Sequence, residues 1–141
     1  MRRSFCSLML AFAALAACGG GDGGNDPQVS LPGSYALSTV DSRALPLVVI
    51  NDSDYKLELL SGSLVIGGNG TFTESVHLRE TDADGTREPI IPCNGTYTRS
   101  GNTLVLTEAE TDDCGGNFSA TWDGRNTVSV DYFGTVAVYR R

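Results

Sequence analysis

The chain has 141 residues, in which 17 acidic side chains outnumber 10 basic ones, for a formal net charge of −7 at pH 7. Nucleic acids and anionic lipid headgroups select basic surfaces, so this balance argues against both, and we expect no nucleic-acid partner. A single histidine and a single lysine leave little material for a nucleophile with its base. We therefore expect no catalytic site, no metal and no cofactor.

Residues 1–17 carry the marks of a secretory signal peptide. Met1-Arg2-Arg3 is a short basic start, and Phe5 to Ala17 is an apolar run broken only by Ser7. That run is shorter than the roughly 20 residues a membrane-spanning helix needs. A basic start, a brief apolar region and small residues at its end predict export with removal of the segment.

The end of this segment, Leu15-Ala16-Ala17-Cys18, resembles the lipobox of bacterial lipoproteins. The resemblance implies that the Cys18 thiol receives a diacylglycerol, that acyl chains such as palmitate anchor the protein to a membrane, and that Cys18 becomes the mature N-terminus. Residues 18–31 are rich in glycine and predict a flexible tether. We expect a lipid anchor in the cell envelope, and in a Gram-negative bacterium Gly19 favours the outer membrane. An ordinary signal peptide with an incidental cysteine is the alternative.

Two of the 4 cysteines are left for the mature domain. Cys6 lies in the signal peptide and Cys18 is assigned to the lipid, so Cys93 and Cys114 remain in an oxidising compartment. A disulfide between them is the expected state there. A metal site is the alternative, but the one histidine, His77, is not near either cysteine in sequence.

We expect residues 32–141 to form one small monomeric domain that is all-β. Short runs of alternating side chains are separated by turn residues, of which Asn69-Gly70 is the strongest hairpin signal. The predicted strands are 34–40, 55–66, 71–78, 95–99, 103–107, 117–122, 127–131 and 135–139, with a further short strand or lid at 45–50 and a bulge at Ser61-Gly62. About eight such strands predict a single antiparallel up-and-down barrel or a sandwich, and closure favours the barrel because it removes free edges.

Alternation then assigns side chains to faces. Phe72, Glu74, Val76 and Leu78 share one side of their strand, whereas His77 falls on the opposite, solvent-facing side. The other predicted interior sets are Leu104 with Leu106, Phe118 with Ala120 and Trp122, and Val128 with Val130.

A series of short motifs completes the pattern: Gly33-Ser34-Tyr35, Leu45-Pro46, the segments 60–64 and 69–72, Gly95-Thr96-Tyr97, and the closing residues 138–141. Together they resemble the small bacterial lipocalin-like lipoproteins, which have calycin-type β-barrels, over nearly the whole mature domain. The resemblance implies an eight-stranded barrel able to hold one small hydrophobic ligand. It also implies a barrel-closing pair, in which Tyr35 stands where typical lipocalins carry Trp and Arg140 stacks its cation on the ring.

Three functions follow from these expectations. In the first, the barrel binds a small hydrophobic ligand, and Phe72, Glu74, Leu104, Phe118 and Trp122 surround the ligand cavity or simply form the core. In the second, the protein is an interaction or inhibitor module of the envelope that acts through its acidic loops at 51–54, 80–88 and 108–113. An enzyme that uses Glu74 as a buried acid is the least favoured reading, because a hydrogen-bonded glutamate inside the barrel mouth explains that residue as well.

Overall fold

The computed structural model describes residues 30–111 and 113–141, and these residues form strands and turns without a helix. The predicted signal peptide, the lipidated Cys18 and most of the predicted tether lie outside the described residues. The strands are β1 (Gly33–Val40), β2 (Arg43–Ala44), β3 (Leu47–Asn51), β4 (Lys56–Ile66), β5 (Thr71–Asp82), β6 (Gly85–Arg87), β7 (Ile90–Ser100), β8 (Thr103–Glu108), β9 (Gly116–Trp122), β10 (Thr127–Tyr132) and β11 (Thr135–Arg140).

Eight of these strands close into an antiparallel barrel, which confirms the predicted fold class. The order around the barrel is β1, β4, β5, β7, β8, β9, β10 and β11. Closure depends on β1, which pairs with β4 over Gly33–Ala36 and with β11 over Ala36–Val40. Because every barrel strand has a neighbour on both sides, the meander leaves no free edge in the barrel wall. These eight strands correspond one to one to the eight that the sequence predicted.

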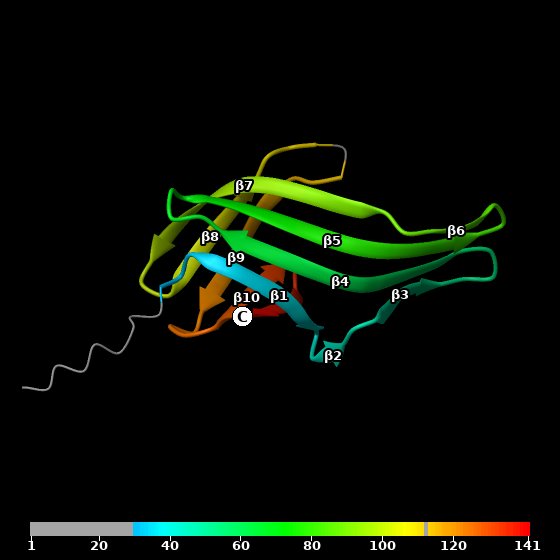
Figure 1. Cartoon of the computed structure of the whole chain (residues 1–141), viewed down its shortest axis with the longest axis horizontal. Helices are drawn as coiled ribbons and strands as arrows, with labels where there is room; N and C mark the ends of the chain where they lie inside the picture. Colours follow the sequence, from blue (N-terminus) through cyan, green and yellow to red (C-terminus); the bar gives the residue numbers. More distant parts are fainter. Residues whose placement is uncertain (1–29, 112) are drawn as a thin grey trace, which may run out of the picture.

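A flat extension, here called the arm, projects from one side of the barrel (Figure 1). The long β4–β5 hairpin continues beyond the barrel wall, where β3 pairs with β4 and β6 pairs with β5. The segment predicted at 45–50 as a strand or a lid is therefore a strand. The sequence did not predict β6, nor that β5 runs on to Asp82 and that β7 begins at Ile90. The end of β5 and β6 are polar and the start of β7 contains Pro92, so neither shows the alternation of a strand, and both gain strand structure from pairing with their neighbours.

The predicted bulge in β4 is present, but slightly earlier than expected. The register of β4 against β5 shifts between Leu59 and Ser61, so Leu60 is the extra residue. Gly62, which suggested the bulge, has a different function. A Cβ at this position would lie 3.0 Å from the side chain of Leu37 and 3.3 Å from the carbonyl oxygen of Ser75. Gly62 therefore permits close packing of β1 on β4.

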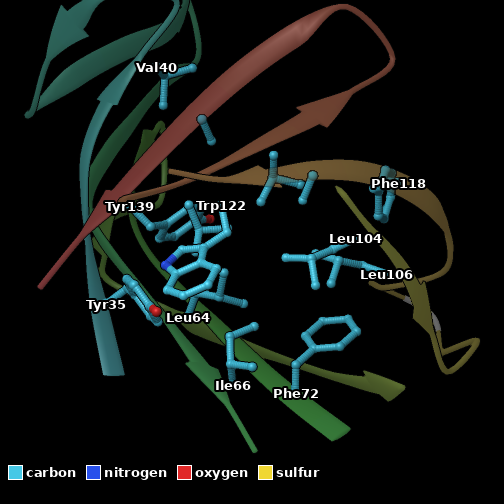
Figure 2. Close-up of a cluster of buried hydrophobic side chains, with 14 of the residues drawn as sticks. Tyr35, Val40, Leu64, Ile66, Phe72, Leu104, Leu106, Phe118, Trp122 and Tyr139 are labelled. Carbon is cyan, nitrogen blue, oxygen red and sulfur yellow. The ribbon is translucent and has the colours of Figure 1, made fainter. Parts of the chain in front are cut away.

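The core lies inside the barrel, where side chains from β1, β4, β5, β8, β9 and β11 point toward one another (Figure 2). The predicted interior positions on β8, β9 and β10 are all buried: Leu104, Leu106, Phe118, Ala120, Trp122, Val128 and Val130. Leu31 is also in this core, with 1% of its surface exposed, and its carbonyl oxygen accepts a hydrogen bond from the Tyr35 hydroxyl at 2.6 Å. The packed domain therefore includes Leu31, which we had assigned to the tether.

The cation that stacks on Tyr35 comes from Arg141 and not from the predicted Arg140. The guanidinium carbon of Arg141 lies 4.8 Å from the ring centroid, and the same group donates hydrogen bonds to the carbonyl oxygens of Ser30 and Pro32. Arg140 is exposed, since strand alternation directs it outward when Tyr139 points inward. Only the residue after the strand is free to fold back across this end of the barrel.

Candidate functional site

The barrel interior is packed at one end and hollow at the other. A cavity of about 570 Å³ occupies the end where β1, β5, β8 and β10 finish and where β4, β7, β9 and β11 begin. It is lined by Leu37, Val40, Leu59, Glu74, Val76, Cys93, Glu108, Asp113, Cys114, Gly115, Phe118, Tyr132, Thr135, Ala137 and Tyr139. We call this end the open end, and the end that holds Trp122 and Tyr35 the packed end.

Side-chain size explains why the two ends differ. At the packed end, Trp122, Phe72 and Tyr35 direct rings into the interior (Figure 2). At the open end, Val76 on β5 and Ala137 on β11 are small inward side chains, and the rings of Phe118, Tyr132 and Tyr139 leave the space between them unfilled. An eight-stranded barrel has room inside either for filling side chains or for one small ligand, and this barrel does each in one half.

The floor of the cavity is a hydrogen-bonded cluster of Glu74, Tyr132 and Tyr139. The Tyr132 hydroxyl donates to Oε2 of Glu74 at 2.7 Å, and the Tyr139 hydroxyl donates to Oε1 at 2.5 Å. Glu74 comes from β5, whereas the tyrosines come from β10 and β11 on the opposite wall, so the cluster spans the interior. Because Glu74 lines the cavity and Phe72 does not, the cluster marks the boundary between the two halves.

Burial dominates the electrostatics of this cluster. The pKa of Glu74 is raised, because removal from water disfavours the carboxylate and Glu108 adds like-charge repulsion, while the hydrogen bonds from the two tyrosines counteract the rise. Desolvation also raises the pKa of both Tyr132 and Tyr139, and the adjacent Glu74 charge adds to the effect. Both tyrosines therefore keep their protons and act as hydrogen-bond donors across the physiological pH range.

One side of the rim is held by the Cys93–Cys114 disulfide, which confirms the predicted pairing. The bond joins β7 to the loop between β8 and β9, with the two Cα atoms 5.7 Å apart. The backbone N–H of Gly115, in the same loop, donates to the Glu108 carboxylate at 2.9 Å. The disulfide and this hydrogen bond place Glu108 and Asp113 beside the cavity.

Three aromatic rings from β9 and the β10–β11 hairpin lie together, and two of them, Phe118 and Tyr132, line the cavity. The ring of Phe118 lies 4.7 Å from Tyr132 and 5.3 Å from Phe133, measured between centroids. Phe133 is 86% exposed, and its backbone has a φ of 55°, in the left-handed region that bulky residues rarely adopt. Phe133 does not line the cavity itself, but it packs on Phe118, which does. Residues in strained backbone conformations are often found near functional sites.

Of the residues expected around a ligand cavity, Glu74 and Phe118 line it. Phe72, Leu104 and Trp122 instead belong to the packed end, as the alternative core interpretation allowed. Tyr132 and Tyr139, which also line the cavity, are not among the residues that the sequence predicted there. Alternation could have found them, because Tyr132 follows Val128 and Val130 in phase.

His77 lies in the barrel wall where the arm begins, paired with Ser61 of β4 and Ile90 of β7. Its Nε2 is 3.5 Å from a Glu88 carboxylate oxygen, and it is not among the residues that line the cavity. Within residues 30–111 and 113–141, no group of three or more His, Cys, Asp or Glu side chains is arranged to hold a metal ion. In the same part of the chain, no helix combines the length and the apolarity that crossing a membrane requires.

No protein-family model matches the sequence, and a comparison with curated proteins finds no match. The fold and the cavity therefore define the class of protein: an eight-stranded antiparallel β-barrel with a cavity at one end, consistent with a calycin-like fold.

Proposed function

We propose that the barrel binds one small, mainly apolar molecule in the cavity at its open end. The observation that carries this proposal is the cavity itself. Protein interiors are close-packed and contain few voids larger than a water molecule, so a space of about 570 Å³ is no packing defect. Its volume falls within the roughly 300–1,000 Å³ typical of small-molecule sites. Its wall is mostly apolar, with a few polar groups gathered at the floor and the rim.

A fluorescence titration with the neutral apolar dye N-phenyl-1-naphthylamine tests this function. We expect saturable binding to the wild-type protein and loss of binding in an Ala137→Phe variant, because the new ring would occupy the cavity. Val136→Phe is the matched control, since Val136 is adjacent on β11 and lies outside the core. Equal dye binding by both variants would contradict the proposal.

We also propose that the protein is a lipid-anchored member of the lipocalin-like lipoproteins of the cell envelope. If the source is Gram-negative, we propose that the lipid anchors it to the outer membrane. The support is the resemblance of residues 15–18 to a lipobox, together with the barrel architecture. Expression in a bacterium fed with labelled palmitate tests the anchor. The wild-type chain should carry the label, and Cys18→Ser should not. An unlabelled wild-type protein would exclude the anchor.

A protein-interaction role is the second candidate, because the arm brings two of the acidic loops together. Asp52, Asp54 and Asp82 line one shallow pocket at the arm tip, with Lys56 as the basic residue among them. A photo-crosslinking residue placed at Asp84 tests this role in the envelope of the source cell. A discrete crosslinked partner that disappears in a D52N/D54N/D82N variant would support it, and crosslinks that persist unchanged would count against it.

A further inference from the structure

The charges around the cavity all have one sign. Glu74 at the floor and Glu108 and Asp113 at the rim contribute three carboxyl groups. Among the described residues that line the cavity, none is Lys, Arg or His. The potential inside a cavity with low-dielectric walls is set by such groups, so this cavity attracts cations and repels anions.

The Glu74 carboxylate has hydrogen-bond acceptor positions left for a ligand. A carboxylate has about four acceptor positions on its two oxygens, and the tyrosine hydroxyls use one on each. The remaining positions belong to a side chain that is 5% exposed and lines the cavity. A buried carboxylate without a nearby cation is costly, and a positively charged donor would relieve that cost.

Aromatic rings, two of which line the cavity, are a second feature that favours cations. Phe118, Tyr132 and Phe133 form a continuous aromatic cluster, and the face of an aromatic ring attracts an ammonium group within about 6 Å. Carboxylates and aromatic rings around an apolar space are together the surroundings that a protonated amine on an apolar body requires. A fatty acid, by contrast, would bring its carboxylate toward three like charges.

We propose that the ligand of the open-end cavity is an amphipathic cation, an apolar body that carries a protonated amine which pairs with Glu74. This inference rests on the proposed binding function and adds the chemical class of the ligand. It also assigns separate functions to the lining residues: apolar walls hold the body, and Glu74 selects the charge.

Three ligands with one chain length test the proposal: decylamine, decanol and decanoic acid, titrated by calorimetry below their aggregation concentrations at pH 8. A primary amine is cationic at this pH, since its pKa is near the value of about 10.4 for lysine. We expect decylamine to bind at least ten-fold more tightly than decanoate, with decanol between them. The preference should shrink as salt is added, because the carboxylates at the rim are screened.

Variants separate the effect of Glu74 from that of net charge. Glu74→Gln should lower the ratio of decylamine to decanol affinity at least five-fold. Asp84→Asn removes the same charge at the arm tip and should change neither the decylamine affinity nor the decanol affinity. If Glu74→Gln does not fold, Glu108→Gln replaces it, with a smaller loss of the amine preference expected.

The outcomes distinguish this inference from the function on which it rests. Equal affinity for all three ligands, or tighter binding of decanoate, would overturn the assignment of a cationic ligand while leaving cavity binding in place. Failure of all three ligands and of the naphthylamine dye to bind would overturn the proposed function as well.

Discussion

Glu74 shows at the scale of one residue how a binding group is kept in an otherwise apolar interior. Its carboxyl group is hydrogen-bonded by two tyrosines from the opposite wall, yet burial still raises its pKa. A group whose pKa is higher in the folded state than in the unfolded chain binds its proton more tightly when folded. Its contribution to stability is therefore complete at low pH and is lost as the pH rises through the folded-state pKa.

We expect the Glu74→Gln variant to reveal this linkage. Glutamine keeps an oxygen for the tyrosine hydroxyls but does not ionise, so the stability of the variant relative to the wild type should increase with pH. The slope should be at most about 1.4 kcal/mol per pH unit, the value for one proton. Urea unfolding of both proteins between pH 4 and 8 measures it. A difference that does not vary with pH would mean that Glu74 titrates normally.

Phe133 is the residue whose local conformation least suits its side chain. Phe133 and Gly134 have φ values of 55° and 97° and join Tyr132 to Thr135, a two-residue hairpin turn of type I′. Such turns favour Asn-Gly. A bulky residue in the left-handed region costs roughly 1–2 kcal/mol.

Phe133→Asn should therefore stabilise the fold by about 0.5–1 kcal/mol, since it places the favoured residue in the turn and loses only an exposed aromatic contact. The same change should weaken binding of the dye and of decylamine, because it removes the ring that packs on the cavity-lining Phe118. Thermal unfolding and titration of one preparation measure both effects. A destabilised variant would show that the packing of Phe133 on Phe118 outweighs the backbone strain.

At the scale of elements, the disulfide is what holds the β8–β9 loop beside the cavity. It joins residues 21 positions apart, and Cys93 is buried in the wall of β7 whereas Cys114 lies in the loop. The backbone of this segment is also joined to β7 by the hydrogen bond that Ala109 N donates to Asn94 O at 2.8 Å, and within the loop Thr111 N donates to Cys114 O at 2.9 Å.

We expect the double variant Cys93→Ser/Cys114→Ser to lose about 3 kcal/mol of stability, the chain-entropy value for a loop of this length. Dye affinity should also fall, because the loop would no longer be held at the rim. Guanidinium unfolding of the oxidised wild type and of the variant measures stability, and dye titration of both proteins measures binding. The same unfolding in the Ala137→Phe background, where no dye should bind, separates the two effects. Unchanged dye affinity would show that the loop does not shape the site.

The arm carries several ion pairs and an excess of acidic side chains. Its basic side chains are all paired with acidic neighbours: Arg79 with Glu88 at 2.7 Å, Arg87 with Asp82 at 2.7 Å, and Lys56 with Glu58 at 3.0 Å. These pairs are exposed, so each contributes little to stability. They nevertheless leave the arm tip with a surplus of carboxylates, which is the basis for the second candidate function.

At the scale of the whole molecule, stability and binding are assigned to opposite ends of one barrel. The packed end contains the large rings and is capped by Leu31 and Arg141, whereas the open end keeps the cavity. A barrel needs only part of its interior to be filled for its walls to hold together. The remaining interior is then free to serve as a site.

Two leucine-to-alanine changes of identical chemistry test this division. Leu104 is 0% exposed in the packed end, and Leu59 is 9% exposed beside the cavity. Leu104→Ala should cost about 3–5 kcal/mol, because it opens a new void among packed side chains. Leu59→Ala only enlarges an existing space and should cost less than about 2 kcal/mol, close to the transfer free energy of the side chain. Equal losses in urea unfolding would contradict the division.

The sequence alone determined the barrel strands and the disulfide. Alternating side chains and turn residues are local signals, so the eight strands and the buried faces of β8, β9 and β10 could be predicted from them. The pairing of Cys93 with Cys114 followed from elimination among 4 cysteines. Glu74 was placed on an inner face by the same alternation.

Only the tertiary structure decided which part of the interior is hollow and what surrounds Glu74. Alternation shows that a side chain points inward but not at which height of the barrel it lies, because height depends on how the register of each strand is staggered against the next. For the same reason Phe72 and Trp122 fill one end while Glu74 and Phe118 line the other. The contact of Tyr132 and Tyr139 with Glu74 joins residues 58 and 65 positions apart, and it exists only because the barrel closes.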